Sequence, residues 1–461
     1  RSKWPKAPIT LAYLPGAAAR SVAVKLIDIA RTHHGELGIT RSCRRALLAW
    51  CALLTAGTLI ACSPPIDSSD ANSVPNGVWR GEIEQLGRLL PFTFMVNGSG
   101  DSLQVSYRNG NEQVAVEQVS YDPTSRVLEL WFPSYSSGLV ATVDGTRMRG
   151  ETFLKRRNQV HQLPFNAQHG LDYRFFEQAA NDHVDLSGRW EVVIDMPKLE
   201  LTQNGVAFFQ QRGPYITGTV NTKVGDYRFL TGEVRGRDLY LSTFDGHGTQ
   251  LWLASLDQEG ILRGSFDTVT YQQAEWKAQR NPEAELDEPT SLTWIKRPFN
   301  GLAFTFPDLD GNPVSLTDER FRDKVVLVVV AGSWCPTCHD EARFMAPYYK
   351  NNKDRGLEVV YLMFEYSDRF EEVEDQVRAF QSRYGIEHTM LFAGDASRTT
   401  RNDILPMLNG IIAFPTTVFV DRKGEVRRIH TAFPGPATGE VHEEYKRELR
   451  TFVDALLAET A

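Results

Sequence analysis

Apolar and polar positions follow two different periods along the last third of the chain. The almost unbroken apolar run at 324–331 is rich in valine and predicts a strand buried on both faces of a sheet. The segment 357–364 has the same character, whereas 439–459 carries apolar residues at helical spacing. This alternation predicts an α/β domain at 301–461. Further expected elements are helices at 336–351, 371–384 and 401–408, a strand at 389–392, and hairpins at 302–306 with 313–316 and 416–421 with 425–431.

Between residues 77 and 281 the pattern changes to short strand-like runs separated by Gly, Asn and Asp turns. The segment also repeats itself, because the block around Trp79 resembles the block around Trp190 and two further pairs of blocks share the same offset. We therefore predict tandem all-β repeats, each a barrel or sandwich, for example a lipocalin-like barrel, with both tryptophans in the cores. These repeats could position the α/β domain, bind a client or hold a small apolar ligand. The predicted repeats span 77–170 and 185–281, and an acidic, proline-containing linker spans 282–300.

The N-terminal region resembles a bacterial lipoprotein signal peptide. In residues 41–61, arginines precede an apolar stretch that runs into Leu59-Ile60-Ala61-Cys62, which is similar to a lipobox. This resemblance implies lipid attachment at Cys62, and Ser63 after it favours the outer membrane. The alternative is an uncleaved membrane anchor or a buried helix. Residues 62–76 are expected to form a tether, and 1–40 are a leader of doubtful relevance, interpreted as upstream sequence or a fragment boundary.

Composition narrows the possible functions. The chain carries a formal net charge of −8 and shows neither a basic stripe nor a nucleic-acid motif, which disfavours nucleic-acid binding. Histidines in the β-rich part are scattered without ligand spacing, so no metal site is predicted.

Candidate chemistry lies where the valine-rich strand passes into the first helix of the α/β domain. Trp334-Cys335-Pro336-Thr337-Cys338 places two cysteines on the first turn of that helix. The helix N-terminus favours Cys335 as a thiolate, which is the attacking species in disulfide exchange. Cys338, one turn further, can resolve the resulting mixed disulfide.

Three motifs make residues 301–461 similar to the TlpA/ResA-like branch of the thioredoxin superfamily, the extracytoplasmic thiol–disulfide oxidoreductases related to the AhpC/TSA group. They are the Cys335–Cys338 motif, the hairpin segment 304–311, and Phe414-Pro415-Thr416-Thr417. The resemblance implies a cis-proline at Pro415, with the Phe414 backbone opposite the dithiol. Trp334 and Pro336 complete the expected client-binding surface, and no cofactor is implied beyond a redox-active disulfide between Cys335 and Cys338.

A proton-transfer group is also implied by the resemblance. Cytoplasmic thioredoxins often carry a buried aspartate at the strand position that is Val329 here. Glu341 matches a glutamate that tunes the cysteines in ResA-like proteins, and it is therefore the expected acid for Cys338. The alternative is that Glu341 only interacts with the helix dipole.

The resulting hypothesis is a lipid-anchored protein at the periplasmic face of the bacterial envelope that exchanges its dithiol with the disulfides of client proteins. A reductase fed by a membrane electron donor, for example in cytochrome c maturation, is favoured by the resemblance. Two alternatives stay open: a thiol-dependent peroxidase of the AhpC/TSA type, and c-type haem attachment at Cys335-x-x-Cys338-His339. For His339 we expect an exposed position beside the site, where its protonation would help to hold a thiolate.

Overall fold

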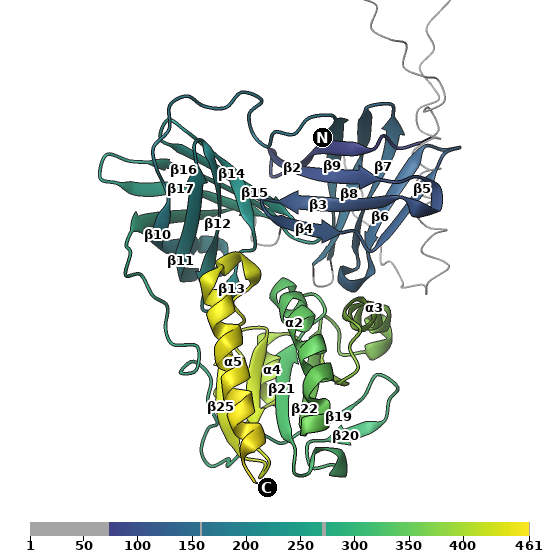
Figure 1. Cartoon of the computed structure of the whole chain (residues 1–461), viewed down its shortest axis with the longest axis vertical. Helices are drawn as coiled ribbons and strands as arrows, with labels where there is room; N and C mark the ends of the chain where they lie inside the picture. The colour runs from purple at the N-terminus through teal and green to yellow at the C-terminus, as the bar shows by residue number, and fades with distance from the viewer. Residues whose placement is uncertain (1–72, 157–158, 270–272, 461) are drawn as a thin grey trace, which may run out of the picture. The chain divides into compact units, whose positions relative to one another are not determined.

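The structure is a computed structural model that describes residues 73–156, 159–269 and 273–460 (Figure 1). The predicted leader and signal peptide, the lipidation site Cys62 and most of the tether lie outside these residues. None of the helices in the described ranges is both long and apolar enough to cross a membrane.

The first repeat is an antiparallel meander of nine strands in the order β4-β3-β2-β1-β9-β8-β7-β6-β5. Alternate side chains along its strands are buried, as in β6. Its edges β4 and β5 do not pair with each other among the described residues, so this sheet stays open. Its strands are β1 (Gly77–Gln85), β2 (Arg88–Asn97), β3 (Gln104–Asn109), β4 (Glu112–Ala115), β5 (Gln118–Asp122), β6 (Val127–Phe132), β7 (Ser137–Asp144), β8 (Arg147–Arg156) and β9 (Gln159–His169).

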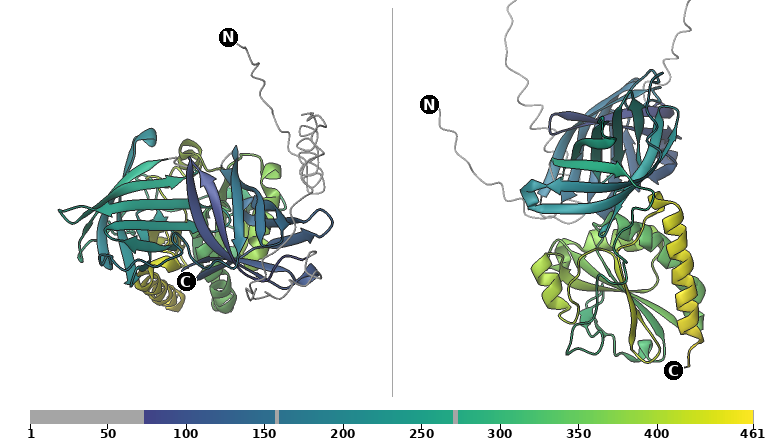
Figure 2. Two further views of the ribbon diagram at one scale, coloured as in Figure 1. Left: turned by 90° about the horizontal axis from the view of Figure 1, so that it is seen from above. Right: turned by 90° about the vertical axis from the view of Figure 1, so that its left-hand side faces the viewer.

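The second repeat has the same strand succession, but it closes. β12 pairs with both β11 and β14, which closes the sheet into a barrel with β13 attached to β12 (Figure 2). The counterparts of β12 and β14 in the first repeat, β3 and β5, do not pair with each other among the described residues. Aromatic rings fill the interior: Trp252 stacks on Phe266 at 4.1 Å and meets Trp276 edge-on at 5.3 Å. Its strands are β10 (Gly188–Met196), β11 (Leu201–Arg212), β12 (Tyr215–Thr222), β13 (Gly225–Asp226), β14 (Leu230–Arg235), β15 (Asp238–Phe244), β16 (Thr249–Leu256), β17 (Ile261–Thr268) and β18 (Ala274–Arg280).

Equivalent side chains confirm the duplication. Trp79 and Trp190 are both buried, and their indole N–H groups donate to Pro75 O at 3.0 Å and Leu186 O at 2.9 Å, four residues earlier in each case. Gly150 and Gly264 also correspond, because any side chain at either would collide with a backbone carbonyl of the neighbouring strand. The sequence prediction of a barrel-like tandem repeat is therefore confirmed, with one closed copy and one open copy.

The open repeat is completed by the closed one. Phe244, at the end of β15, packs its ring against Phe92 at 4.8 Å and Tyr107 at 4.9 Å inside the first repeat. The Asn109 side-chain amide donates to Phe244 O at 3.1 Å. Leu251 belongs to the same buried cluster, so the two repeats share an apolar core. We refer to residues 77–281 as the β region.

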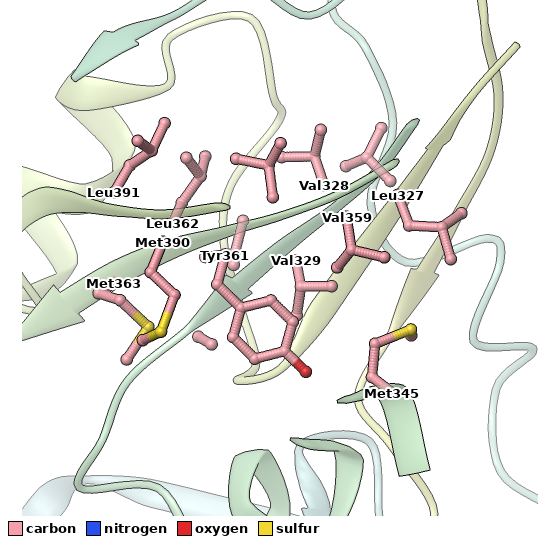
Figure 3. Packing of buried hydrophobic residues seen from close by; sticks show 14 of the residues in the cluster. Leu327, Val328, Val329, Met345, Val359, Tyr361, Leu362, Met363, Met390 and Leu391 are labelled. Atoms are coloured by element: carbon pink, nitrogen blue, oxygen red, sulfur yellow. The ribbon is translucent and has the colours of Figure 1, made fainter. Parts of the chain in front are cut away.

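The C-terminal domain has a five-stranded sheet in the order β23-β22-β21-β24-β25. β21 runs parallel to β22 and antiparallel to β24, and every residue of β21 is buried. Side chains alternate between the faces of the sheet, so Val329 and Tyr361 point toward Met345 of α2 while Val328 and Leu362 point away (Figure 3). Its strands are β19 (Thr305–Pro307), β20 (Pro313–Ser315), β21 (Val325–Ala331), β22 (Leu357–Glu365), β23 (Thr389–Asp395), β24 (Thr416–Val420) and β25 (Val426–Thr431). Its α-helices are α2 (Pro336–Asn352), α3 (Glu374–Tyr384), α4 (Arg398–Ile404) and α5 (Glu440–Ala458).

Candidate active site

The dithiol lies where β21 passes into α2, as the sequence predicts. Cys335 is the N-cap residue of α2, and its Sγ accepts a hydrogen bond from the Cys338 N–H at 3.3 Å. Pro336 occupies the first helical position, where its missing N–H costs the helix nothing. Both cysteines are free thiols. The backbone donors of the first turn therefore face the sulfur that is expected to attack.

The segment with Pro415 lies directly opposite Cys335. The Phe414–Pro415 peptide bond is cis, as the resemblance implies. Cys335 Sγ donates to Phe414 O at 3.4 Å, and Thr337 Oγ1 donates to the same carbonyl at 3.0 Å. Phe414, Pro415 and Cys335 are all buried, and only 4% of Cys335 is exposed. The Phe414 carbonyl, which is expected to contact an extended client, thus already accepts hydrogen bonds from Cys335 and Thr337.

Cys338 is fully buried behind Cys335. Burial raises the pKa of the Cys338 thiol well above its ordinary value, and the neighbouring Cys335 and Glu341 raise it further. Cys338 therefore stays a protonated thiol at neutral pH until a base removes its proton.

Glu341 is positioned to be that base. Burial raises the pKa of its carboxyl to about 8, against a lowering effect of the hydrogen bond from Thr417. Thr417 Oγ1 donates to Glu341 Oε1 at 2.8 Å, and Thr417 pairs with Val329 across the sheet. Glu341 of α2 thus places a carboxyl next to the strand position that Val329 occupies, where cytoplasmic thioredoxins often have an aspartate.

Trp334 and Pro336 are only half-buried, and they form the accessible rim of the site. The Trp334 indole donates to Phe364 O at 2.8 Å, stacks on Tyr366 at 4.6 Å and meets the Phe414 ring edge-on at 5.1 Å. These contacts fix the ring beside the dithiol and leave part of it available to a client.

Glu365, which the sequence analysis did not single out, holds the loop before Cys335. Ser333 donates to its two carboxylate oxygens, from the backbone N–H at 2.8 Å and from Oγ at 2.7 Å. Burial raises the pKa of Glu365 to about 7, against the lowering effect of the Ser333 hydrogen bonds and of Lys155 in the β region. A carboxylate at the end of a buried strand, next to the dithiol loop, was the available signal.

The expected exposed position of His339 is wrong. His339 is buried, with Nδ1 at 2.9 Å from Tyr384 Oη and Nε2 at 2.7 Å from Ser333 O. The ring of Tyr135 from the β region stacks on it at 3.9 Å. Burial therefore lowers the pKa of His339 well below its usual value, and the imidazole cannot hold a thiolate by being charged at neutral pH. With both ring nitrogens in hydrogen bonds, it is also not presented as a haem ligand.

A buried ionic cluster joins the β region to α2, and no local sequence signal reveals it. Arg228 forms an ion pair with Asp340 of α2, and its Nη2 lies 2.6 Å from Glu112 Oε1. Arg228 Nε is 3.6 Å from Asp245 Oδ2. Burial alone would lower the pKa of Arg228, but these carboxylates raise it well above its ordinary value. The guanidinium is therefore charged in this cluster.

The chain is similar to known proteins in part of its sequence. Residues 299–444 match the Redoxin family. The thiol-disulfide oxidoreductase ResA of Bacillus thuringiensis subsp. konkukian (strain 97-27) is 26% identical over 148 residues, which cover 32% of this chain and 74% of that protein. ResA of Bacillus subtilis (strain 168) is 27% identical over 128 residues, covering 28% of this chain and 63% of that protein. A thioredoxin family thiol:disulfide interchange protein from Chlorobium tepidum TLS, of known structure, is 21% identical with a TM-score of 0.27, covering 36% of this chain and 100% of that chain.

Proposed function

Since the C-terminal domain is a ResA/TlpA-like thiol–disulfide oxidoreductase domain of the thioredoxin superfamily, we propose that this protein reduces disulfides of client proteins in the bacterial envelope. Cys335 attacks, Cys338 resolves and Glu341 manages the proton. Trp334, Pro336, Phe414 and Pro415 form the surface that receives the client. The single observation that carries this proposal is the free thiol of Cys335 at the N-cap of α2, facing a cis-proline segment.

The reaction proceeds through two sulfur exchanges. The Cys335 thiolate attacks one sulfur of the client disulfide, forms a mixed disulfide and releases the other client sulfur as a thiolate, which takes up a proton. Cys338 then loses its proton and attacks Cys335 Sγ. This step forms the Cys335–Cys338 disulfide and releases the second client thiol. The client gains two electrons and two protons, and the protein dithiol supplies them.

Glu341 serves the second exchange. A thiol with a strongly raised pKa needs a base whose own pKa lies near the working pH, because such a base is partly ionised and still basic enough to accept the proton. The pKa of about 8 at Glu341 meets that requirement. The negative charge of Glu341 contributes to the raised pKa of Cys338, which supports their proximity.

The raised pKa of Cys338 also supports the reducing direction. A dithiol protein becomes an oxidant when its reduced form is stabilised, as it is when a thiolate is favoured. Burial of Cys338 works against a thiolate at that position. The oxidised protein then requires re-reduction, which we assign to a membrane electron donor.

The location rests on the lipobox-like sequence that ends at Cys62. We propose that a lipid on Cys62 anchors the protein, with the outer membrane favoured by Ser63. Metabolic labelling with a fatty acid tests this assignment: the wild-type protein takes up label, and Cys62→Ser does not. Label on Cys62→Ser, or none on the wild-type protein, contradicts lipid attachment at this residue.

The redox assignment is tested by trapping and by insulin reduction. Cys338→Ala should accumulate mixed disulfides with clients, because the resolving thiol is gone, and Cys335→Ala should accumulate none. Cys335→Ala should also lose insulin reduction, with Cys335→Ala/Cys338→Ala as the background control. Full insulin reduction by Cys335→Ala would reject the roles given to the two cysteines.

A further inference from the structure

The turn that follows β12 lies against the dithiol motif. A Cβ placed on Gly225 of β13 would sit in tight contact, 3.1 Å from the Thr337 methyl group, and the positive φ of Gly225 (121°) also favours glycine at this position. Asp226 Oδ2 accepts a hydrogen bond from the Gly435 N–H at 2.6 Å. Gly435 precedes η8 (Pro436–Thr438), and the same loop reaches the cis-proline through Ala432, whose N–H donates to Pro415 O at 2.9 Å. Residues 223–229 thus contact the dithiol motif and the loop that is hydrogen-bonded to Pro415.

Ion pairs of Arg228 hold this turn against α2 and β4. Arg228 reaches Asp340 on α2, two residues after Cys338, and at the same time Glu112 on β4. Asp245, which follows β15, faces it from a third side. The neighbouring Asp226 accepts a hydrogen bond from the Arg228 N–H at 2.7 Å. One guanidinium therefore ties the β region to the helix that carries the dithiol.

A second contact covers the same end of α2. Tyr135 of η3 (Pro133–Tyr135) stacks on His339, and Ser136 Oγ donates to Gln376 Oε1 of α3 at 3.0 Å. Glu117 pairs with Arg383 of α3. Together with the turn, these contacts surround the N-terminus of α2, and only 4% of Cys335 and 7% of both Thr337 and Phe414 are exposed.

The contacts of the turn at 223–229 are largely polar, which distinguishes them from the apolar contact between the two repeats. The buried apolar cluster of the C-terminal domain is built, among the described residues, from positions between Leu302 and Leu457 only. Buried ion pairs add little net stability compared with apolar packing, although they fix geometry well. Three carboxylates face the guanidinium and Asp226 accepts from the Arg228 backbone N–H. Burial raises the pKa of Glu112, Asp226 and Asp340. An interface of this kind can separate without exposing an apolar core.

We propose that the turn at 223–229, pinned by Arg228, is a specificity element that shields Cys335 from bulky molecules and yields to client segments with a basic side chain beside their disulfide. When the turn leaves, Asp340 loses Arg228 and stays on α2 close to the dithiol. A client arginine or lysine then replaces Arg228 at this carboxylate. This inference rests on the proposed function, because it concerns which disulfides reach Cys335.

Alkylation with two maleimides of different size tests the shield. N-ethylmaleimide and a polyethylene-glycol maleimide share one reactive group, so the ratio of their rates at Cys335 reports access and cancels changes in thiolate content. In the full-length protein, Arg228→Met and Asp340→Asn should each raise the rate of the bulky reagent relative to the small one on the order of tenfold or more. Arg126→Met, which removes an exposed ion pair with Asp144, is the matched control and should leave the ratio unchanged.

Background labelling is defined by Cys335→Ala, and circular dichroism checks that each variant is folded. The two variants remove opposite partners of the same ion pair. Either variant alone is therefore sufficient for the test if the other does not fold. An unchanged ratio in the folded variants overturns the shield. If the wild-type protein reduces insulin in that case, the proposed function still stands. If the wild-type protein shows no dithiol-dependent insulin reduction, the proposed function is rejected instead.

The client preference has its own measurement. Two short disulfide peptides that differ only by Arg or Gln beside one cysteine are offered as substrates. The wild-type protein should reduce the Arg peptide about threefold faster or more, and Asp340→Asn should remove that difference. Equal rates for the two peptides with the wild-type protein would contradict the basic-client assignment.

Discussion

Glu341 Oε1 accepts a hydrogen bond from Thr417 Oγ1 at 2.8 Å, while the second carboxylate oxygen of Glu341 has no hydrogen-bond partner among the described residues. A buried carboxyl with one satisfied oxygen and one free oxygen is held in place and can still exchange a proton. The same arrangement places the negative charge next to Cys338, the thiol that must be deprotonated in the resolving step.

Glu341→Gln should slow insulin reduction by about a hundredfold, because the amide keeps the acceptor for Thr417 but cannot take a proton. The wild-type rate should also rise with pH through an inflection near 8, where the Glu341 carboxyl ionises. The variant should lack this inflection. A pH–rate profile from 6 to 9.5 checks both points, and an unchanged inflection near 8 in the variant would assign it to another group.

The stability of the folded protein should fall as the pH rises through the pKa of Glu341, whereas the rate of insulin reduction should rise. The pKa of Glu341 is raised from 4.5 to about 8 in the folded protein, so the folded state binds the proton more tightly than the unfolded state. The stabilising contribution is complete below pH 4.5 and is lost as the pH rises through 8. Relative to the wild-type protein, Glu341→Gln should therefore gain stability between pH 5 and pH 9 in chemical unfolding experiments. A constant difference over this range would contradict the raised pKa.

Glu365→Gln should loosen the loop that delivers Cys335. Ser333 donates two hydrogen bonds to Glu365, and an amide can accept only one of them, which leaves a buried donor unpaired at a cost of about 1–3 kcal/mol. Thermal unfolding should shift down, and the alkylation rate of Cys335 should change in the folded variant. The exposed Glu371, in the short helix η7 (Phe370–Glu372) that follows β22, provides the control substitution Glu371→Gln, for which we expect neither effect.

His339→Phe should behave as the loss of a neutral, buried imidazole. The substitution leaves Tyr384 Oη and Ser333 O without their partner, and we expect a loss of about 1–3 kcal/mol at pH 7.5. Because the folded-state pKa of His339 lies well below 6.5, the wild-type protein loses this contribution as the pH falls below that value. The difference between the two proteins should therefore shrink toward pH 5. A difference that grows on acidification would mean that His339 is charged in the folded protein.

Phe244→Ala should destabilise the two repeats together. The Phe244 ring lies in the core of the first repeat although it belongs to a strand of the second, and truncation of a buried phenylalanine costs about 3–5 kcal/mol. Chemical unfolding followed by far-ultraviolet circular dichroism should show an earlier transition of the β region. Leu86→Ala, at an exposed site in the turn between β1 and β2 of the first repeat, is the control. Separate transitions for the two repeats in the wild-type protein would contradict a shared core.

Features with a local signature could be predicted from the sequence. The valine-rich strand β21, the dithiol on the first turn of α2 and the cis-proline segment each occupy a few adjacent residues, and the structure brings them together. The duplication was visible because the blocks around Trp79 and Trp190 and two further pairs of blocks share one offset. The closure of one copy alone was not visible, since the pairing of β12 with β14 depends on how far each sheet curves.

Long-range contacts account for what the sequence did not reveal. Arg228 and Asp340 are 112 positions apart, and nothing in either neighbourhood marks them as partners. The wrong expectation for His339 has the same cause, because Tyr135, far upstream, covers a position that the local pattern would leave in water. Glu365 was not singled out for a different reason, since a carboxylate at the end of a strand is usually exposed to solvent.

The open first repeat has a consequence for how the β region can be divided. The closed second repeat has its own continuous sheet, whereas the first repeat has an open sheet whose core includes Phe244 of the second. A domain boundary drawn between the two copies would therefore divide one folding unit. The first repeat expressed alone would lack the Phe244 ring that completes its core.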